Sequence, residues 1–166
     1  MNYKMQVNKK MESLLKDAKV YKSNDKINVF DLLLIMNPKI KNINGCLIVD
    51  NEDEISSNII NFQRIINAFG DRTGYEASCN EFRVNDILLG DDNDLNNILI
   101  LSENIINNWC FKFKVNYPDK KFCIILSVDE NNVTIRFHQI WEDESLWIKE
   151  NIETYSQPIG YTIIGK

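Results

Sequence analysis

The spacing of apolar residues along the chain predicts three amphipathic helices. The first lies at the N-terminus and places these residues along one side: Tyr3, Val7, Met11, Leu14, Leu15 and Ala18. The second follows a short apolar strand at residues 46–49, and its apolar face consists of Ile55, Ile59, Phe62, Ile65, Ile66 and Phe69. The third begins after Asp94 and carries Leu95, Ile98, Leu99, Ile105, Ile106, Trp109 and Phe113. We therefore expect three helices that each bury one side.

The ends of the second helix carry the usual polar signals. Asn51, with Glu54 three positions later, is the predicted N-cap, in an approximate capping box. Gly70 follows the last apolar residue and is the predicted C-terminal stop.

The third helix has a clear start and two possible ends. Three aspartates within residues 91–94 lie at its start, where the helix dipole favours negative charge. Residues 111–115, FKFKV, alternate like a strand, and YPDK at 117–120 would then be a hairpin turn. The helical spacing instead continues to Tyr117 and stops at Pro118. We favour the longer helix.

Strict alternation near the C-terminus predicts a β-hairpin. One strand turns Phe122, Ile124, Leu126 and Val128 to one face, and its partner does the same with Val133, Ile135 and Phe137. Residues 129–132, DENN, have the composition of a four-residue loop.

Five further segments complete the pattern. Residues 28–38 contain a short apolar run ended by Pro38 and predict a buried helix or strand, and residues 75–84 predict a strand. Residues 85–90 predict a short helical turn, and residues 144–158 an irregular helical turn ended by a proline. Residues 160–165, GYTIIG, predict a closing strand at the sheet edge.

These elements predict an α+β fold with a single domain. We expect an antiparallel or mixed sheet in which the C-terminal β-hairpin packs against amphipathic helices. Residues 1–22 form a basic amphipathic helix, either docked or a mobile arm, and residues 23–166 form the domain.

Charge limits the kinds of partner. Residues 1–22 hold six lysines and two carboxylates, a local charge of +4, which leaves −9 for residues 23–166 of the total of −5. An acidic body repels nucleic-acid phosphates, so we expect no nucleic acid and favour a basic protein partner. No apolar run reaches the roughly 18 residues that span a bilayer, and no signal peptide is present, so we expect a cytoplasmic protein without membrane contact.

The sequence predicts neither a metal site nor a cofactor. Cys46, Cys79, Cys110 and Cys123 form no C-x-x-C pair, and we expect buried thiols. The phosphate-binding glycine motifs, the nucleophile-elbow motif and the calcium-loop pattern are all missing from the chain.

The segment IRFHQIWEDESLW at residues 135–147 is the candidate functional site. Strand alternation places Arg136 and His138 on a more polar sheet face, opposite Ile135 and Phe137. Just beyond the strand lie two tryptophans around an acidic run: Trp141, Glu142, Asp143, Glu144 and Trp147.

Three interpretations of this segment compete. His138 could be a general base with Arg136 as an anion clamp, although no second histidine supports a metal site. The segment could instead be a recognition patch, since tryptophan and arginine are enriched at binding hot spots. In the third interpretation both tryptophans pack under the C-terminal segment, Arg136 pairs with a cross-strand carboxylate, and the acidic residues are solvated. This last interpretation leads, because large aromatic side chains usually pack at least partly inside.

Residues 94–164 carry a resemblance to a known group of proteins. In order they contain a helix with Trp109, then NYPDKKF, a hairpin with TIRFHQ, ESLW, and a closing YSQPIGYTI. This arrangement resembles small bacterial α+β immunity proteins of polymorphic or contact-dependent toxin systems. The resemblance implies a stoichiometric inhibitor that occludes a toxin domain, and it transfers no individual residue.

The leading hypothesis is therefore a protein-binding module of the immunity or antitoxin type, with an acidic surface for a basic toxin domain. One alternative is a small enzyme that uses His138 and Arg136. The other is a structural homo-oligomer, paired through the edge at residues 160–165 or through a second apolar strip on the third helix, formed by Ile100, Phe111 and Val115.

Overall fold

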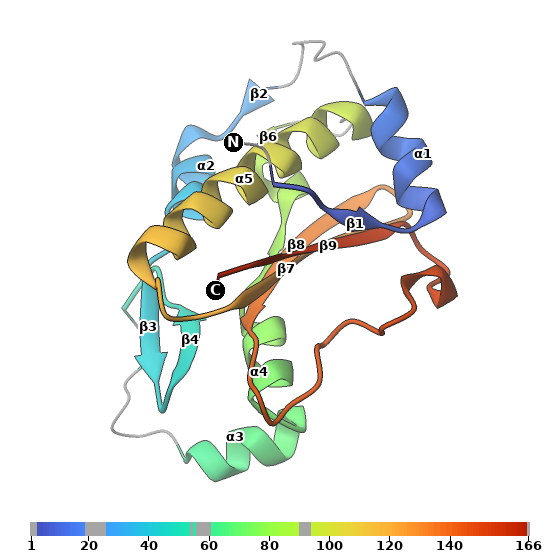
Figure 1. Ribbon diagram of the computed structural model, residues 1–166. Helices are drawn as coiled ribbons and strands as arrows, with labels where there is room; N and C mark the ends of the chain where they lie inside the picture. The colour runs from blue at the N-terminus through green and yellow to red at the C-terminus, as the bar shows by residue number, and fades with distance from the viewer. Residues whose placement is uncertain (1–2, 19–25, 54, 56–60, 90–93, 166) are drawn as a thin grey trace.

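Five strands form one antiparallel sheet in the computed structural model, which describes residues 3–18, 26–53, 55, 61–89 and 94–165 (Figure 1). In spatial order they are β1 (Gln6–Val7), β9 (Ile159–Ile164), β7 (Phe122–Asp129), β8 (Asn132–Gln139) and β5 (Glu81–Arg83). Every neighbouring pair is antiparallel. The predicted α+β class is confirmed, and the sheet is antiparallel rather than mixed.

The long helix α5 (Leu95–Asn116) runs across one face of this sheet (Figure 1). Asp94 is its N-cap and accepts a hydrogen bond from the Asn96 N–H at 2.9 Å, and the helix ends before Pro118. Residues 111–115 are therefore helical, as we favoured. The predicted apolar faces of this helix and of the hairpin meet in one buried core: Ile98, Leu99, Ile105, Ile106, Trp109, Phe113, Phe122, Ile124, Leu126, Val128, Val133, Ile135 and Phe137.

The β7–β8 hairpin is tighter than the sequence suggested. Asp129 and Asn132 are paired residues at the ends of the two strands, so the loop contains only Glu130 and Asn131. Glu130 has a φ of 54°, in the left-handed region that two-residue hairpin loops use. The predicted four-residue loop is wrong because pairing continues one position further on each strand.

The N-terminal segment is docked. Helix α1 (Lys9–Asp17) packs on α5, and Met11 is fully buried. Asn8 caps α1 by accepting a hydrogen bond from the Met11 N–H at 3.0 Å, and its side chain also accepts from the Ile159 N–H of β9 at 3.1 Å. Val7, expected on the helix, lies in β1 instead. Because β1 pairs with β9, the closing strand is not the edge that we predicted.

The middle of the chain departs furthest from the predictions. Helix α3 (Phe62–Phe69) begins at Asn61, whose side chain accepts a hydrogen bond from the Arg64 N–H at 3.1 Å. The predicted cap Asn51 is wrong, because its side chain binds the Lys39 N–H at 2.9 Å. The predicted box partner Glu54 and the apolar residue Ile59 lie outside the described residues. Gly70 ends the helix with a φ of 90°, as predicted.

The strand expected at residues 75–84 is mostly a helix. Residues Arg72–Cys79 form α4, and only Glu81–Arg83 form a strand. The predicted helical turn is present as the 3-10 helix η1 (Val84–Ile87), followed by the short strand β6 (Leu88–Leu89). Asp71 is the N-cap of α4 and accepts a hydrogen bond from the Gly74 N–H at 2.6 Å, a local signal that the strand prediction overlooked. Glu144, far away in the sequence, binds the first N–H groups of the helix as well.

A second, two-stranded sheet is formed by β3 (Ile40–Ile43) and β4 (Cys46–Val49). Asn44 and Gly45 at its turn both have positive φ, 50° and 93°, as a type I′ turn requires. This hairpin packs against α3 and α4 around a separate small core of Ile43, Cys46, Ile48 and Tyr75.

Residues 28–38 form the helix α2 (Val29–Met36), which settles the choice between helix and strand. It follows β2 (Lys26–Ile27), which pairs with β6. The end of α2 is fixed to α5 by two hydrogen bonds, from the Trp109 indole N–H to the Ile35 carbonyl at 2.7 Å and from the Asn108 amide to the Met36 carbonyl at 2.6 Å. Of the eight residues of this helix only Ile35 is buried, so the expectation of a buried element is wrong.

The other face of the sheet is covered by the chain that leaves β8. Residues 140–158, including the 3-10 helix η2 (Ile152–Thr154), enclose a third core of Cys123, Ile125, Ile148 and Ile159. None of the helices in the described ranges has the length and hydropathy needed to cross a bilayer. Three of the four cysteines are buried as expected, and Cys79 is exposed.

We expect Gly160→Ala in β9 to detach β1 from the sheet. A Cβ at this position would lie 2.6 Å from Val7 Cγ1 and 3.0 Å from the Gln6 carbonyl oxygen, closer than packed atoms tolerate. Overpacking of this kind lowers the free energy of unfolding by about 1–3 kcal/mol. Urea denaturation measures the loss, and hydrogen exchange at the Asn8 N–H, which donates to the Ile159 carbonyl at 2.9 Å, reports the detachment. The control is Ile163→Thr, at an exposed position of the same strand. A Gly160→Ala protein as stable as the control would contradict the expectation.

Candidate functional site

Arg136 is held inside the fold rather than presented to a partner. It lies opposite Glu81 of β5, and its guanidinium forms an ion pair with that carboxylate at 2.7 Å. The guanidinium also stacks 4.2 Å above the ring of Trp147, and only 13% of its side chain is exposed. This is the cross-strand pairing that the packing interpretation expected.

His138 lies on the predicted side of β8, opposite Cys123 of β7, but that side is not a polar surface. The residue is fully buried beneath the segment that follows β8. Its Nδ1 lies 2.6 Å from the Gln139 carbonyl oxygen, and burial lowers its pKa. The expected polar sheet face is therefore wrong at this position, and the imidazole is closed to a substrate from solution.

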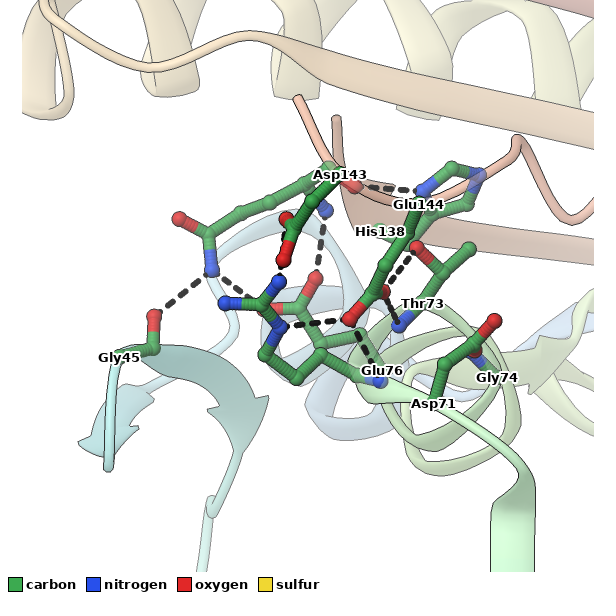
Figure 2. Close-up of polar contacts among 10 residues, drawn as sticks. Gly45, Asp71, Thr73, Gly74, Glu76, His138, Asp143 and Glu144 are labelled. Carbon is green, nitrogen blue, oxygen red and sulfur yellow. Dashed lines mark hydrogen bonds and ion pairs between the residues drawn. The ribbon is translucent and has the colours of Figure 1, made fainter. Parts of the chain in front are cut away.

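The acidic run is divided between structural and exposed positions. Glu144 lies at the start of α4, where it accepts hydrogen bonds from the Thr73 N–H and hydroxyl, each at 2.8 Å, and from Arg72 Nε at 2.6 Å (Figure 2). Burial opposes ionisation of Glu144, but these hydrogen bonds outweigh burial and leave its pKa below the ordinary value. Asp143 forms a second ion pair with Arg72, and Glu142 is exposed. The expectation of a fully solvated acidic run is wrong for Glu144.

Trp141 packs beneath the β3–β4 turn. The Arg72 guanidinium stacks 4.1 Å from its ring, and Gly45 leaves room for the edge of the indole. Beside it lies a depression of about 520 Å³ whose lining includes two lysines and two carboxylates: Lys120, Lys121, Asp119 and Glu142. Because these charges cancel, the depression selects for neither anions nor cations.

A buried polar network connects α4 to the five-stranded sheet and to the β3–β4 sheet. Glu76 accepts hydrogen bonds from the Leu47 N–H of β4 at 2.7 Å and from the Gln139 N–H of β8 at 2.6 Å. The Gln139 side-chain amide donates to Glu76 as well, and to the Gly45 carbonyl at 2.8 Å (Figure 2). One turn later, Asn80 accepts from the Val49 N–H at 2.9 Å and donates to the Leu47 carbonyl at 2.8 Å.

The chemistry of Glu76 is that of a structural carboxyl group. The residue is fully buried, and desolvation raises its pKa even though three hydrogen bonds from Gln139 and Leu47 favour the charged form. Each of its oxygens already accepts from a protein donor. The network therefore fixes the position of the β3–β4 hairpin and offers no free group to a substrate.

The most unusual surface was missed by sequence reasoning and lies on α2, at the periphery of the molecule (Figure 1). Val29, Phe30, Leu33 and Leu34 are 61%, 79%, 54% and 47% exposed. Soluble proteins rarely expose large apolar side chains together unless the surface binds something. We call these four residues the α2 strip. Its signal was in the sequence, because a helix that is apolar on all sides must be covered by something.

A groove of about 420 Å³ runs beside the α2 strip, between α2 and the β5–η1 segment. Its apolar lining consists of Leu34, Ile35, Phe82 and Ile87. Its charged lining consists of Asp31, Glu81, Asp86 and Arg83. Carboxylates outnumber the single guanidinium, so the groove joins an apolar floor to an acidic rim.

Metal chemistry finds no arranged ligands in the part of the chain that the structure describes. There, no group of three or more histidine, cysteine, aspartate or glutamate side chains is placed to hold an ion.

Comparison with known proteins gives the family. A family model described as "Uncharacterized protein PM0498 family" matches residues 6–165, from β1 to the end of β9. The chain belongs to this family. The PM0498 protein of Pasteurella multocida (strain Pm70) is 29% identical over 124 residues, which cover 71% of this chain and 74% of that protein. No solved structure matches the chain. The family match includes every strand of the five-stranded sheet, and also the α2 strip.

For this PM0498-family protein we expect Glu144→Ala to destabilise α4. The change removes the side chain that binds the first N–H groups of the helix and the Arg72 guanidinium, which is worth about 1–3 kcal/mol in unfolding free energy. Glu142→Ala, two residues away and exposed, is the control and should change stability by less than about 0.5 kcal/mol.

The same pair of variants gives a pH signature. A lowered carboxyl pKa stabilises the fold above the ordinary glutamate range, and this contribution disappears as the pH falls through the lowered pKa. The difference between wild type and Glu144→Ala should therefore shrink in acid. Equal effects of the two alanine variants at neutral pH would contradict the capping role.

We expect Glu76→Gln to lower stability and to remove a pH dependence. Glutamine has one acceptor oxygen where the carboxylate uses two, so a buried N–H is left unpaired, at about 1–3 kcal/mol. A raised pKa means that the stability contribution of Glu76 is present below the ordinary glutamate pKa and is lost as the pH rises through the raised value. The wild-type unfolding free energy should fall in that window, whereas the variant should lack this fall. Glu142→Gln, as control, should keep it; a Glu76→Gln protein that also keeps it would refute the assignment.

Proposed function

We propose that this PM0498-family protein is a protein-binding module that neutralises a toxin by occluding it, as an immunity protein does. The observation that carries the proposal is the α2 strip, four large apolar side chains left uncovered on a helix that is firmly anchored from behind. Their exposure has no role in the stability of the isolated chain. A partner that covers these side chains would bury their apolar surface and so gain binding free energy.

The energy available from the α2 strip is substantial but incomplete. Complete burial of a valine, leucine or phenylalanine side chain stabilises by about 1.5–3 kcal/mol, so covering the exposed fractions of these four supplies roughly 5 kcal/mol. Association itself opposes binding by about 4–15 kcal/mol. A stable complex therefore uses the α2 strip as its apolar centre and polar contacts around it.

The charge of the molecule favours a basic partner. The chain carries −5 overall and −9 over residues 23–166, so it attracts a cationic surface at long range. The resemblance of residues 94–164 to immunity proteins points the same way. In this proposal the protein acts in the cytoplasm, where its free cysteines remain reduced, and it needs no cofactor.

The candidate site at residues 135–147 takes a secondary part in this proposal. Arg136, His138 and Glu144 are engaged inside the fold, while Glu142, Asp143 and Trp147 remain exposed and can contribute to the rim of an interface. Trp141 is half-buried, with Arg72 stacked on its ring. The enzymatic alternative has little support, because His138 has no access to solvent. The homo-oligomeric alternative is supported by Phe111 and Val115, two apolar side chains that are exposed on α5.

The proposal is tested with the product of the gene adjacent to the one for this chain. We expect a complex with a dissociation constant in the micromolar range or tighter, and an association rate that falls at least tenfold between about 0.05 M and 0.5 M salt, since steering by charge is screened. Production of the chain should also restore growth of cells that make the adjacent protein. The absence of a complex at about 10 μM, or growth that is not restored, would contradict the proposal.

A further inference from the structure

We propose that the α2 strip and the groove beside it bind an amphipathic helix whose apolar face is flanked by lysine or arginine. This inference rests on the proposed function as a protein-binding module and names the chemistry of the partner. Three features of the surface support it: the spacing of its apolar side chains, the charge of its rim, and its anchoring.

The spacing of the α2 strip fits a helix. Val29 and Leu33 are four residues apart, as are Phe30 and Leu34, so the side chains form two parallel ridges with a furrow between them. Ridges at this spacing are the ones that interdigitate when two helices pack together. At eight residues, α2 is about 12 Å long, and it therefore presents about two helical turns to its partner.

The charge of the rim selects a basic flank. Asp31 lies on α2 itself and Asp86 lies on η1 across the groove, and neither carboxylate forms an ion pair with any described residue. Glu81, the third carboxylate of the groove, is already paired with Arg136. The Arg83 guanidinium donates to the Asn132 side chain at 2.9 Å. Asp31 accepts a hydrogen bond from the Asn28 side-chain amide through Oδ2 at 2.5 Å, and this neutral partner leaves its charge uncompensated. Asp31 and Asp86 can thus attract cations on a partner whose apolar residues cover the α2 strip.

The surface is formed before binding. Asn28 caps α2, its side chain accepting from the Phe30 N–H at 3.1 Å, while its own N–H donates to the Ile87 carbonyl at 2.8 Å. The other end of the helix is held by Trp109 and Asn108 of α5. A docking helix therefore meets ordered ridges and loses little entropy in arranging them. It also follows that exposed residues of the α2 strip can be changed without unfolding the chain.

The test uses three fluorescein-labelled peptides of about 18 residues, a length that supports a helix. The first has leucines on one helical face and lysines elsewhere, the second has glutamate in place of every lysine, and the third has the composition of the first with its leucines scattered. Fluorescence anisotropy with the full-length protein should show micromolar binding of the first peptide. The glutamate and scattered peptides should bind at least tenfold more weakly.

Protein variants locate the binding. Phe30→Ser and Leu33→Ser should each weaken the first peptide at least tenfold, with circular dichroism and melting temperature unchanged. Phe111→Ser removes an exposed apolar side chain of α5 and is the matched control, which should bind like wild type. Asp31→Asn combined with Asp86→Asn should weaken binding at about 0.01 M salt and have little effect at about 1 M, where the screening length falls from about 30 Å to about 3 Å.

Four outcomes with the peptides, the variants or the partner would overturn the inference, and a fifth would overturn only the proposed function. Equal binding of the scattered peptide would mean that charge alone attracts it, and an unchanged Phe30→Ser protein would place the site elsewhere. Sedimentation that shows a wild-type dimer, dispersed by Phe30→Ser, would mean that a second copy occupies the α2 strip. If the adjacent gene product binds and Phe30→Ser has no effect on that complex, the inference fails while the proposed function stands. If the peptide result holds but the adjacent product does not bind, the proposed function is the part that fails.

Discussion

Two buried polar side chains, Glu76 of α4 and its C-cap Asn80, hold the five-stranded sheet and the β3–β4 sheet together. Strand β8 is longer than its neighbour β5, which pairs only with residues 134–136, so the last backbone groups of β8 need other partners. The N–H of Gln139 donates to Glu76, and the Phe137 carbonyl accepts from Asn80 at 3.3 Å. The same two side chains satisfy the facing edge of β4. Unpaired backbone N–H and C=O groups are costly inside a protein. The side chains of Glu76 and Asn80 therefore take the place of a neighbouring strand at the end of β8.

This arrangement explains why the polar and aromatic residues after β8 serve the fold. The chain leaves β8 over the second face of the sheet, and on its way it places Glu144 against the start of α4 and Trp147 against Arg136. Residues that resemble a binding cluster in the sequence thus connect α4 and β5 to the segment that encloses the third core. Glu142, Asp143 and Trp147 are the members of the cluster that still face solvent.

The sequence predicted those parts of the fold whose signals are local. The stripe on α5 and the alternation in the β7–β8 hairpin each lie within a continuous stretch, and both were confirmed. The helix α4 was missed although its N-cap, Asp71, is local, because its first turn is also bound by Glu144, 72 residues beyond Arg72, and no local pattern shows that contact. His138 shows the same limit: alternation gave its side of the strand correctly, but only the folded chain shows what covers that side.

The candidate surface was misjudged for a related reason. The apolar composition of α2 predicted a buried helix or strand, but composition alone cannot tell which of its side chains the rest of the chain buries. In the structure, Ile35 and the last carbonyls of α2 face inward, while the four residues of the α2 strip are exposed.

The way in which α2 is fastened has an evolutionary consequence. Its attachment includes hydrogen bonds to main-chain carbonyl groups and to an asparagine cap at its start, whereas its outward side chains are apolar and take no part in these hydrogen bonds. Natural variation can therefore accumulate at the outward positions without passing through unfolded intermediates, so the surface that α2 presents can change while the scaffold stays the same.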